Sequence, residues 1–525
     1  MPLVRVLVFH GYLLRGTGSN IYNASLAAAL VKLGHEVHIL CQDRHASELD
    51  FVDAVGTFEN GSLSLETLRE PVRCTAYLPE IGRILPVYVA DEYEGFEAKP
   101  FGELTGAELD HYLDANVAAV RTVAEAVKPE VALANHAVMG PAILAQALGD
   151  EVPYAVKIHG SALEYTVRPD PERFLPYARE GIEPAKGVLV GSRHMAERLW
   201  ELVDVESLRE KTRLGPPGVD TDAFTPLPRR EAAARVKELS AKLRRGGARW
   251  GGDANGWAAL RALDPEHEPV VAYVGKLIVS KGVDLLIAAW PLVVERVPNA
   301  RLCVVGFGTY RGALTRLIDA LANGDLAAAR EIAARGRELE GGPTGELKLL
   351  ASFLDSLEGE RRERYLGLAA YGAERIHFTG RLEHEDLPLL LPACEAQVVP
   401  STFPEAFGMV VVEGAACGLL PIAADHSGLA EVTDELELVL PDELRSLMSF
   451  RLEQGSVEAI AERLLTWLEL DPKERRHAGC ALADRAAERY GWDHVASGVV
   501  AAAQGRLDAL PSTEPAGSPS LRPSG

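Results

Sequence analysis

Two glutamates lie on either side of an apolar run in the second half of the chain. Glu405 follows a proline, and seven residues separate it from Glu413. Residues 408–417 have helical spacing, which puts Glu405 in the loop before a helix and Glu413 roughly one and a half turns inside it. A carboxylate at a helix start is commonly only a partner of the helix dipole. Glu413 has apolar neighbours such as Val412 and Ala415, so we expect it to be buried and to need a partner.

Two lysines bracket a loop directly after another strand-like segment. Lys276 and Lys281 lie in the sequence VGKLIVSKGVDLL, in which Gly282 precedes the next helical pattern. Both ammonium groups would bind one anion if they meet at the edge of a sheet, although solvated loop lysines are the alternative. A second anion-binding candidate is the loop of residues 15–20, where Gly16, Thr17 and Gly18 would let backbone N–H groups approach a phosphate. A plain tight turn is the alternative there.

Three histidines occupy the ends of predicted strands in the first half of the chain. His159 ends the segment 154–158 and is expected to donate a hydrogen bond to a substrate oxygen. His10 and His136 end comparable strands, and Arg193 follows another strand-like run. A backbone-bonded histidine and a three-histidine zinc site are the alternatives, but no metal-ligand spacing supports zinc, and we expect no metal and no cofactor.

The elements that carry these residues follow a repeating strand–loop–helix pattern. β-branched runs ending in glycine or histidine are followed by helical spacing at several places along the chain, which predicts an α/β fold with doubly wound parallel sheets. Such sheets bind ligands outside the carboxyl ends of their strands. The predicted organisation is a first Rossmann-like domain over residues 1–215, completed by a helix around 485–505; a hinge and basic helical linker over 216–268; a second Rossmann-like domain over 269–484 with a helical insertion at 312–374; and a disordered tail over 506–525.

Composition narrows the class of protein. The chain has 525 residues, 47% of them hydrophobic, and a formal charge of −22, which argues against nucleic acid as a partner. The N-terminal sequence predicts a strand rather than a signal peptide, and no apolar run is long enough to span a membrane. We therefore expect a cytoplasmic protein. The basic helix 230–245 is expected to be a solvated face, with contact to an anionic membrane as the alternative.

These motifs together resemble the GT-B glycosyltransferases of the retaining family 4 type, which carry an EX7E motif. The matching segments are the glycine loop and first helix, VGKLIVSKGVDLL, FTGRL at 378–382, the segment from Ser401 that holds both glutamates, and HSGLAEV. The resemblance covers nearly the whole chain, apart from the insertion and the tail. It implies a GT-B fold, in which two doubly wound Rossmann-like domains face each other across a cleft. The domain over residues 1–215 would then bind the acceptor, and the domain over 269–484 the nucleotide-sugar donor.

The resemblance also implies roles for individual residues. Glu405 would bind hydroxyls of the donor sugar and Glu413 those of the ribose, while Lys276 and Lys281 would neutralise the diphosphate. His159 would lie near the donor sugar, and His10, His136 and Arg193 would lie on the acceptor side. The other donor-binding positions implied are Gly16, Thr17 and Gly18 on the phosphates, Arg381 and Leu382 beside the base, and Phe407, Gly408, Met409 and Val410 on the sugar or diphosphate. Lys276 stands where the family usually has arginine, so it keeps the charge but not the two-pronged geometry.

The expected activity is therefore transfer of a hexosyl group, with retention, from a nucleotide-diphospho-sugar to a hydroxyl acceptor. A UDP-sugar is favoured over GDP-mannose, and the mechanism is expected to be metal-independent. The alternatives are a GT-B sugar-nucleotide epimerase and a non-catalytic sugar-nucleotide-binding protein. A glycan phosphorylase would need a lysine for pyridoxal phosphate, and no segment of this sequence resembles that site. The acceptor is left open between a sugar, a small molecule and a lipid-linked molecule. The insertion 312–374 is left open between shaping an acceptor site and forming a homo-oligomer interface.

Overall fold

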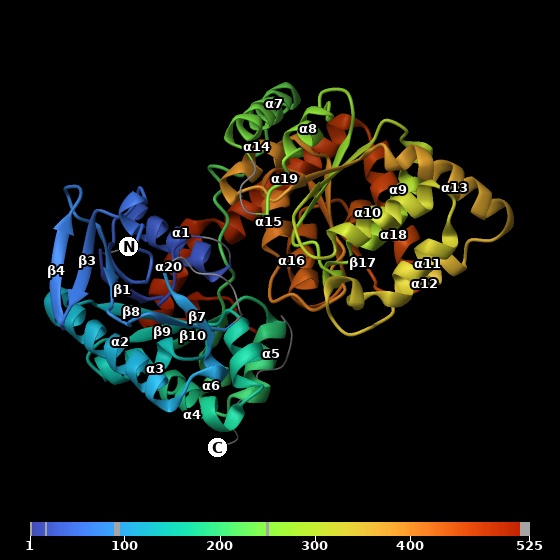
Figure 1. Cartoon of the computed structure of the whole chain (residues 1–525). Coiled ribbons are helices and arrows are strands. Elements are labelled where there is room, and N and C mark those ends of the chain that lie inside the picture. The colour runs from blue at the N-terminus through green and yellow to red at the C-terminus, as the bar shows by residue number, and fades with distance from the viewer. Residues whose placement is uncertain (1–2, 16–17, 89–94, 248–250, 515–525) are drawn as a thin grey trace, which may run out of the picture. The chain divides into compact units, whose positions relative to one another are not determined.

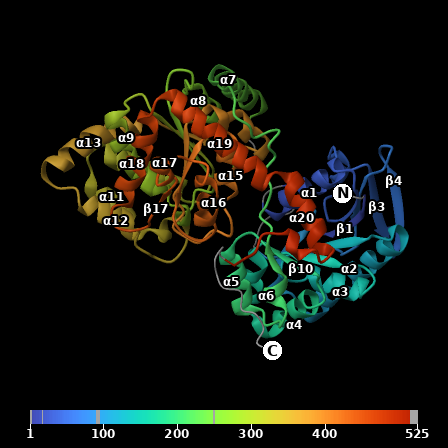
Figure 2. The ribbon, with the colours of Figure 1, turned by 180° about the vertical axis from the view of Figure 1, so that it is seen from behind.

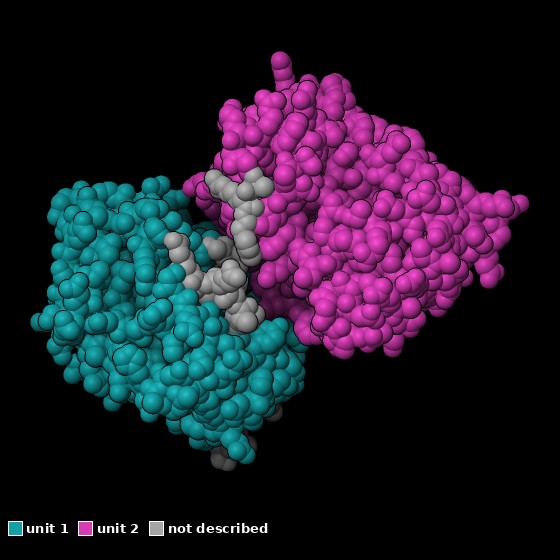
Figure 3. Space-filling view, in the orientation of Figure 1, with its two compact units in different colours: residues 1–218, 490–525 teal, residues 219–489 magenta. Residues whose placement is uncertain are grey.

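The computed structural model describes residues 3–15, 18–88, 95–247 and 251–514. The chain divides into two compact units, which Figure 3 shows in different colours. Unit 1 comprises Met1–Gly218 and Tyr490–Gly525, and unit 2 comprises Val219–Arg489. Each is described separately below.

Unit 1 is built on a nine-stranded sheet with the strand order β11-β10-β9-β8-β1-β2-β5-β3-β4. The strands are β1 (Arg5–Phe9), β2 (Glu36–Leu40), β3 (Ala54–Glu59), β4 (Ser62–Thr67), β5 (Cys74–Leu78), β8 (Val131–Asn135), β9 (Tyr154–Lys157), β10 (Gly187–Val190) and β11 (Thr212–Leu214). All neighbouring strands run parallel except the hairpin of β3 and β4. β8, β9 and β10 are buried along their whole length, as strands covered on both faces must be. A separate pair is formed by β6 (Ile84–Val87) and β7 (Glu97–Pro100).

Helices cover both faces of this sheet (Figures 1 and 2). One face packs on α2 (Gly106–Val127), α3 (Gly140–Leu148), α4 (Pro171–Ile182), α5 (Arg193–Leu202) and α6 (Leu208–Lys211). The other face packs on α1 (Ser19–Lys32) and α20 (Trp492–Ala503), which contact each other although they come from opposite ends of the chain. The two faces form separate apolar clusters, which is the arrangement expected of a doubly wound sheet.

The segment after α20 corrects the expected disordered tail over 506–525. Residues Leu507–Ala509 form a short 3₁₀ helix, and Ser512 forms a β-bridge with Arg213 beside β11. The Leu214 N–H donates to the Pro511 carbonyl at 3.0 Å. These backbone bonds extend the edge of the sheet, so the chain is ordered up to residue 514, four residues into the Pro- and Ser-rich stretch that begins at Pro511. Residues 515–525 lie outside the described part of the chain.

Unit 2 contains a six-stranded parallel sheet with the order β14-β13-β12-β15-β16-β17. The strands are β12 (Val270–Val274), β13 (Arg301–Val305), β14 (Ile376–Gly380), β15 (Ala396–Val399), β16 (Leu420–Ala424) and β17 (Ser449–Phe450). The helices that follow β12 are α9 (Val283–Arg296), α10 (Arg311–Ala322), α11 (Leu326–Arg335), α12 (Lys348–Asp355), α13 (Gly359–Ala373), α14 (Leu387–Leu390), α15 (Met409–Ala416), α16 (Ser427–Glu437), α17 (Asp442–Arg445), α18 (Ser456–Glu469) and α19 (Pro472–Tyr490). The strand order puts the loops after β12 and β15 side by side at the carboxyl edge of the sheet.

The segment expected to be a hinge and linker, 216–268, belongs for the most part to unit 2. It forms α7 (Arg229–Gly246) and α8 (Gly256–Arg261), which pack on each other. α7 also contacts α14, and α8 contacts β14. Val236 and Leu239 are buried, so the apolar side of this basic helix is covered by the unit itself. No helix in the described part of the chain is long and apolar enough to cross a membrane.

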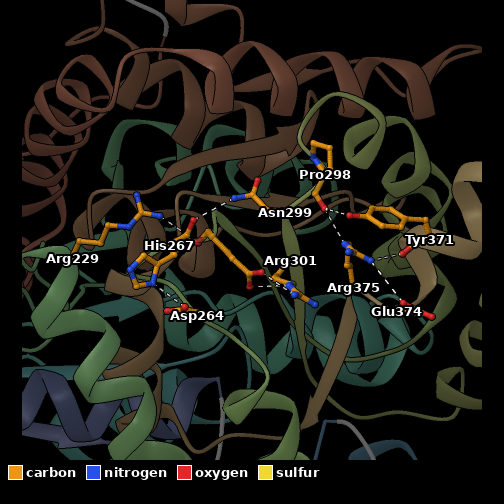
Figure 4. Close-up of polar contacts among 10 residues, drawn as sticks. Arg229, Asp264, His267, Pro298, Asn299, Arg301, Tyr371, Glu374 and Arg375 are labelled. Atoms are coloured by element: carbon orange, nitrogen blue, oxygen red, sulfur yellow. Dashed lines mark hydrogen bonds and ion pairs between the residues drawn. The ribbon is translucent and has the colours of Figure 1, made fainter.

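The amino-terminal edge of the same sheet carries a polar cluster that is satisfied internally (Figure 4). Arg301, at the start of β13, forms an ion pair of 2.8 Å with Glu268, which precedes β12. Arg375 and Tyr371 both donate to the Pro298 carbonyl at 2.9 Å. Because parallel sheets bind ligands at the opposite edge, we read this cluster as structural.

Candidate functional site

The central contact of unit 2 is an ion pair between Lys281 and Glu405. Lys281 ends the short 3₁₀ helix Val279–Lys281 after β12, and Glu405 lies in the loop after β15. Ser401 donates a second hydrogen bond to the same carboxylate, at 2.6 Å. The Lys281 and Glu405 side chains are 30% and 26% exposed, so both are partly open to a ligand. The pair combines a fixed cation with a carboxylate that can accept from hydroxyls.

A glycine allows these two loops to approach each other. Gly282 has a φ of 64°, and a Cβ atom there would lie 1.9 Å from the carbonyl oxygen of Pro400. The backbone N–H of Thr402 donates to the Ser280 carbonyl at 2.8 Å. The loops are therefore joined through the backbone as well as through the ion pair, and only glycine fits at position 282.

The backbone of Glu405 is held by the HSG sequence at the start of α16. The N–H of Glu405 donates to Ser427 Oγ at 2.9 Å, and Gly428 N–H donates to the Glu405 carbonyl at 3.0 Å. His426 Nε2 faces the Ser401 carbonyl at 2.7 Å and therefore carries the ring proton, which leaves Nδ1 to accept from Ser427 at 2.9 Å. These bonds fix the direction in which the Glu405 side chain leaves the loop.

Glu413 is buried in α15, as the apolar spacing around it predicts, and it has a partner. His384 Nε2 donates to its carboxylate at 2.8 Å. Only 4% of the Glu413 side chain is exposed, against 40% for His384. Burial alone lowers the pKa of His384, but the hydrogen bond and charge of Glu413, with the charge of Asp220, raise this pKa above its ordinary value. The histidine is therefore drawn towards its charged form.

The first turn of α15 lies directly after Glu405. Gly408 precedes the helix and offers no side-chain cap, and the first N–H groups of a helix, here those of Met409 and Val410, have no acceptor within it. Phe407 adjoins them in the loop. These predicted donor-binding positions thus share one segment with Glu405. The dipole of the helix favours a negative charge at this end.

The residues predicted beside a nucleotide base lie at the end of β14. Leu382 is buried, and Arg381 forms a 2.8 Å ion pair with Glu383. The Arg381 N–H donates to the Gly251 carbonyl at 2.9 Å, which ties β14 to the loop before α8. Arg381 borders a cavity of about 60 Å³ that is also lined by Lys242, Asp253, Trp257, Thr379 and Asp386.

The structure does not bring the two lysines of the loop to the same partner. Lys276 is exposed and, among the described residues, makes no ion pair, whereas Lys281 reaches Glu405. Gly16 and Thr17 lie outside the described residues. Gly18 precedes α1 with a φ of 61° and supplies no side-chain cap.

The unit 1 residues singled out in the sequence follow four neighbouring parallel strands. His10 follows β1, His136 follows β8, His159 follows β9, and Arg193 begins α5 after β10. The ring centroids of His136 and His159 are 4.9 Å apart. The carboxyl edge of this sheet therefore carries a histidine cluster. Among the described residues, no group of three or more His, Cys, Asp or Glu side chains is arranged to hold a metal ion.

Two buried asparagines that sequence reasoning missed determine which ring nitrogens of this histidine cluster carry a proton. Asn135 donates from Nδ2 to the Phe9 carbonyl at 3.1 Å, so its Oδ1 must be the atom that faces His159 Nε2 at 2.8 Å. His159 therefore carries its proton on Nε2, and Nδ1 is an acceptor. Asn23 donates to Nδ1 of His10 at 3.0 Å and accepts from Asn135 at 2.8 Å. The His159 proton is thus held by Asn135, and the neutral ring offers an acceptor rather than the expected donor.

Burial keeps these rings neutral. It lowers the pKa of His10 to about 4. Burial, with the nearby charges of His136, Lys157 and His10, holds the pKa of His159 well below its usual range. His136 has a φ of 69°, and neither of its ring nitrogens has a hydrogen-bond partner among the described residues. At neutral pH the cluster therefore has no charge and is suited to hydroxyl groups rather than anions.

The partners that sequence analysis missed were His384, Asn23 and Asn135. Neither asparagine belongs to a recognisable motif, and His384 lies 29 residues from the carboxylate it binds. The only signal in the sequence was position: His384 follows β14, Asn135 ends β8, and Asn23 lies in α1. Those places become informative only when the strand order is known.

Comparisons with known proteins agree with this architecture. Residues 17–210 match the family model described as glycosyl transferase 4-like domain. Residues 261–326 and 351–481 match the model described as glycosyl transferases group 1. The first match falls in unit 1 and the second in unit 2.

Curated relatives and a solved structure were also found. A GDP-mannose-dependent monoacylated alpha-(1-6)-phosphatidylinositol monomannoside mannosyltransferase of Corynebacterium glutamicum is 23% identical over 60% of this chain and 65% of its own length. A D-inositol 3-phosphate glycosyltransferase of Mycobacterium sp. (strain KMS) is 28% identical over 52% of this chain and 44% of its own. The matches thus span less than two thirds of either relative.

The structure of HepE from Anabaena, in complex with UDP and glucose, has a TM-score of 0.52 with 16% identity and covers 97% of this chain and 100% of its own. This likeness concerns the fold, which both parallel sheets also support. The chain therefore has a GT-B fold and carries a glycosyl transferase 4-like domain followed by a glycosyl transferase group 1 domain.

Proposed function

We propose that this protein is a retaining glycosyltransferase that moves a hexosyl group from a nucleotide-diphospho-sugar to a hydroxyl acceptor. The observation that carries the proposal is the Lys281–Glu405 pair at the carboxyl edge of the unit 2 sheet, directly before the first turn of α15. A cation, a hydroxyl-binding carboxylate and helix N–H groups within one segment suit a diphosphate joined to a sugar.

In the proposed reaction, unit 2 binds the donor. Lys281 and the first N–H groups of α15 hold the diphosphate, with Lys276 adding charge from the same loop. As the bond between the sugar and the phosphate breaks, negative charge grows on the leaving nucleoside diphosphate. Fixed positive groups aimed at that charge lower the barrier, and such terms are often the largest in catalysis. We propose that this fixed charge makes the reaction metal-independent.

The carboxylates and histidines have separate proposed tasks. Glu405 accepts from hydroxyls of the donor sugar, and Glu413, held by His384, accepts from the ribose hydroxyls. Neutral His159 accepts from a sugar hydroxyl through Nδ1. His10, His136 and Arg193 act on the acceptor side. The leaving diphosphate takes the proton of the acceptor hydroxyl on the same face of the sugar, which retains the configuration.

The comparisons suggest which substrates to test. The Corynebacterium relative is named for GDP-mannose and HepE was solved with UDP and glucose, so both donors are candidates for this chain. The names of the two curated relatives contain an inositol phosphate and a phosphatidylinositol mannoside. D-inositol 3-phosphate is therefore the first acceptor to test. We further propose a cytoplasmic location, on the sequence features given above.

The decisive experiment mixes the purified full-length chain with UDP-glucose, GDP-mannose or ADP-glucose, with and without acceptor. Release of nucleoside diphosphate that depends on the acceptor, with an α-linked product detected by NMR, is the expected result. Isomerised donor without transfer would show an epimerase. Binding of donor without turnover would show a sugar-nucleotide-binding protein, and no binding of any donor would overturn the proposal.

A further inference from the structure

A segment of unit 2 that the group 1 family model does not match reaches the lysine loop. The model covers residues 261–326 and 351–481 and omits 327–350. This omitted segment contains all of α11 except its first residue, and a short 3₁₀ helix, Arg337–Glu340. It lies within the helical insertion whose role the sequence left open.

The contact is made by one carboxylate. Glu340 Oε2 accepts a hydrogen bond from the backbone N–H of Val279 at 2.7 Å. The Glu340 side chain is 12% exposed, so the bond is shielded from water. Val279 is the first residue of the 3₁₀ helix that ends at Lys281, and Ile278 before it supplies no side-chain cap. An N–H at this position has no acceptor within its own helix, and Glu340 provides one from 61 residues away.

The other residues of the loop are held by different elements. Leu277 donates to the Phe307 carbonyl at 2.8 Å and accepts from the Tyr310 N–H at 3.1 Å. The Tyr273 hydroxyl donates to the Lys276 carbonyl at 2.9 Å. After Val279, the Ser280 carbonyl accepts from Thr402. The loop is therefore bound at Leu277 to the segment after β13 and at Ser280 to the segment after β15. Glu340 holds Val279, which lies between these two points.

Backbone contacts join the chain segments before and after the 3₁₀ helix that carries Glu340. Gly336, which precedes it, forms a β-bridge with Gly345, and Leu347 N–H donates to the Ala333 carbonyl at 2.8 Å. Arg337 lies 3.5 Å from the Glu340 carboxylate. The carboxylate is thus presented from a short closed turn rather than from a free loop.

We propose that Glu340 is a positioning residue for the Lys276–Lys281 loop, and that residues 327–350 act as a support for the anion-binding edge of unit 2. By holding Val279, Glu340 fixes the turn from which Lys281 reaches Glu405. It acts through the backbone and touches no substrate. The part of this inference that concerns a bound diphosphate rests on the function proposed above.

The first test follows the loop in the free protein and does not depend on activity. Glu340→Ala removes the acceptor, and Glu340→Gln keeps an acceptor oxygen while removing the charge. Hydrogen exchange of a peptide covering 276–282 is expected to be faster in the alanine variant and close to wild type in the glutamine variant. Glu338→Ala is the matched control, because Glu338 lies in the same 3₁₀ helix and its carboxylate bonds to Arg335 and Thr344 rather than to the lysine loop. Unchanged exchange in Glu340→Ala would overturn the proposal.

The second test measures the affinity for UDP and GDP by calorimetric titration. Losing one charge-assisted hydrogen bond that orders the loop is expected to weaken binding about tenfold in Glu340→Ala. Glu340→Gln should restore most of the affinity, and Glu338→Ala should bind like wild type. Equal loss in Glu340→Ala and Glu338→Ala would show a general loosening of the insertion and overturn the positioning role. If wild type binds neither nucleotide, the proposed function fails, while the exchange experiment still decides the role of Glu340.

Discussion

Glu413, buried inside α15, and His384, in the loop after β14, share a hydrogen bond of 2.8 Å. The Phe224 ring lies 5.3 Å from the imidazole and limits its orientation. A buried carboxylate without a partner would destabilise the folded state by several kcal/mol, and the hydrogen bond from His384 offsets this for Glu413. The pair also links the stability of unit 2 to pH.

The first prediction concerns that link. The folded pKa of His384 lies above its ordinary value of 6.5, so the folded state binds its proton more tightly than the unfolded state does. The stabilisation is fully present below pH 6.5 and is lost as the pH rises through the folded pKa. His384→Gln should therefore lower the unfolding midpoint at pH 6 more than at pH 8, measured by thermal denaturation.

A matched control for this prediction is His267→Gln. His267 also bonds to a carboxylate, that of Asp264 at 2.9 Å (Figure 4). Its side chain, however, is 72% exposed. Exposed pairs contribute little to stability. Equal pH dependence in His384→Gln and wild type would contradict the assignment of the charged pair.

The second prediction concerns the Lys281 ammonium. Lys281→Ala removes the cation next to Glu405 and should weaken binding of UDP or GDP by at least about tenfold, whereas binding of the free nucleoside should change little. Calorimetric titration with both ligands checks this. Lys237→Ala, on the exposed side of α7, is the control. Unchanged affinity for the diphosphate would place that group elsewhere.

The third prediction concerns Glu405. Glu405→Gln keeps an acceptor for Ser401 but loses the charge that pairs with Lys281 and receives sugar hydroxyls. We expect kcat to fall by about 100-fold or more, because contacts of this kind act mainly in the transition state, while the donor Kd changes only modestly. Steady-state rates and donor titration are compared. A variant that turns over at the wild-type rate would refute the catalytic role.

The fourth prediction concerns the tautomer of His159. Asn135→Asp replaces the amide oxygen that accepts from Nε2 with a carboxylate, which should raise the pKa of His159 and leave the ring charged near neutral pH. ¹⁵N NMR of histidine-labelled protein across a pH titration reports the protonation of both ring nitrogens. Asn116→Asp also buries a carboxylate, but in α2, where Asn116 donates to the Tyr112 carbonyl, and is the control. Finding His159 protonated on Nδ1 in the wild type would disprove the assignment.

The fifth prediction concerns Lys157, which is buried at the end of β9 and donates to the Gly215 carbonyl. Burial lowers its pKa from 10.5 to about 7. Between these values the unfolded state holds a proton that the folded state lacks, so the destabilisation caused by Lys157 is full below pH 7 and fades as the pH rises to 10.5. The unfolding free energy of Lys157→Met minus that of wild type should fall over this range, by at most about 1.4 kcal/mol per pH unit.

Lys211→Met is the comparison for that experiment. Lys211 is also buried, but its Nζ donates to two carbonyls, those of Ile182 and Glu183. Burial lowers the pKa of Lys211 as well. The unfolding free energy of Lys211→Met minus that of wild type should therefore also fall as the pH rises, but by a smaller amount. Chemical denaturation at several pH values supplies the free energies, and a flat difference for Lys157→Met would count against a shifted lysine.

Short-range pattern was enough to predict much of this architecture. Apolar spacing placed Glu413 inside a buried helix and Glu405 before it, because helical periodicity relates residues only a few positions apart. Alternating strand and helix signals predicted two parallel sheets with loops at one edge. The same reasoning was wrong about residues 506–514, which composition marked as disordered and which backbone pairing with β11 orders.

The contacts that make these residues a candidate site lie beyond the reach of such patterns. Lys281 and Glu405 are 124 residues apart, and they meet because β12 pairs with β15. Asn23 and Asn135 are 112 residues apart and meet because β1 pairs with β8. Residue types and local spacing thus determined which side chains are available at each strand end. Strand order, which depends on the packing of the whole sheet, decided which of them touch and therefore their charge and tautomer.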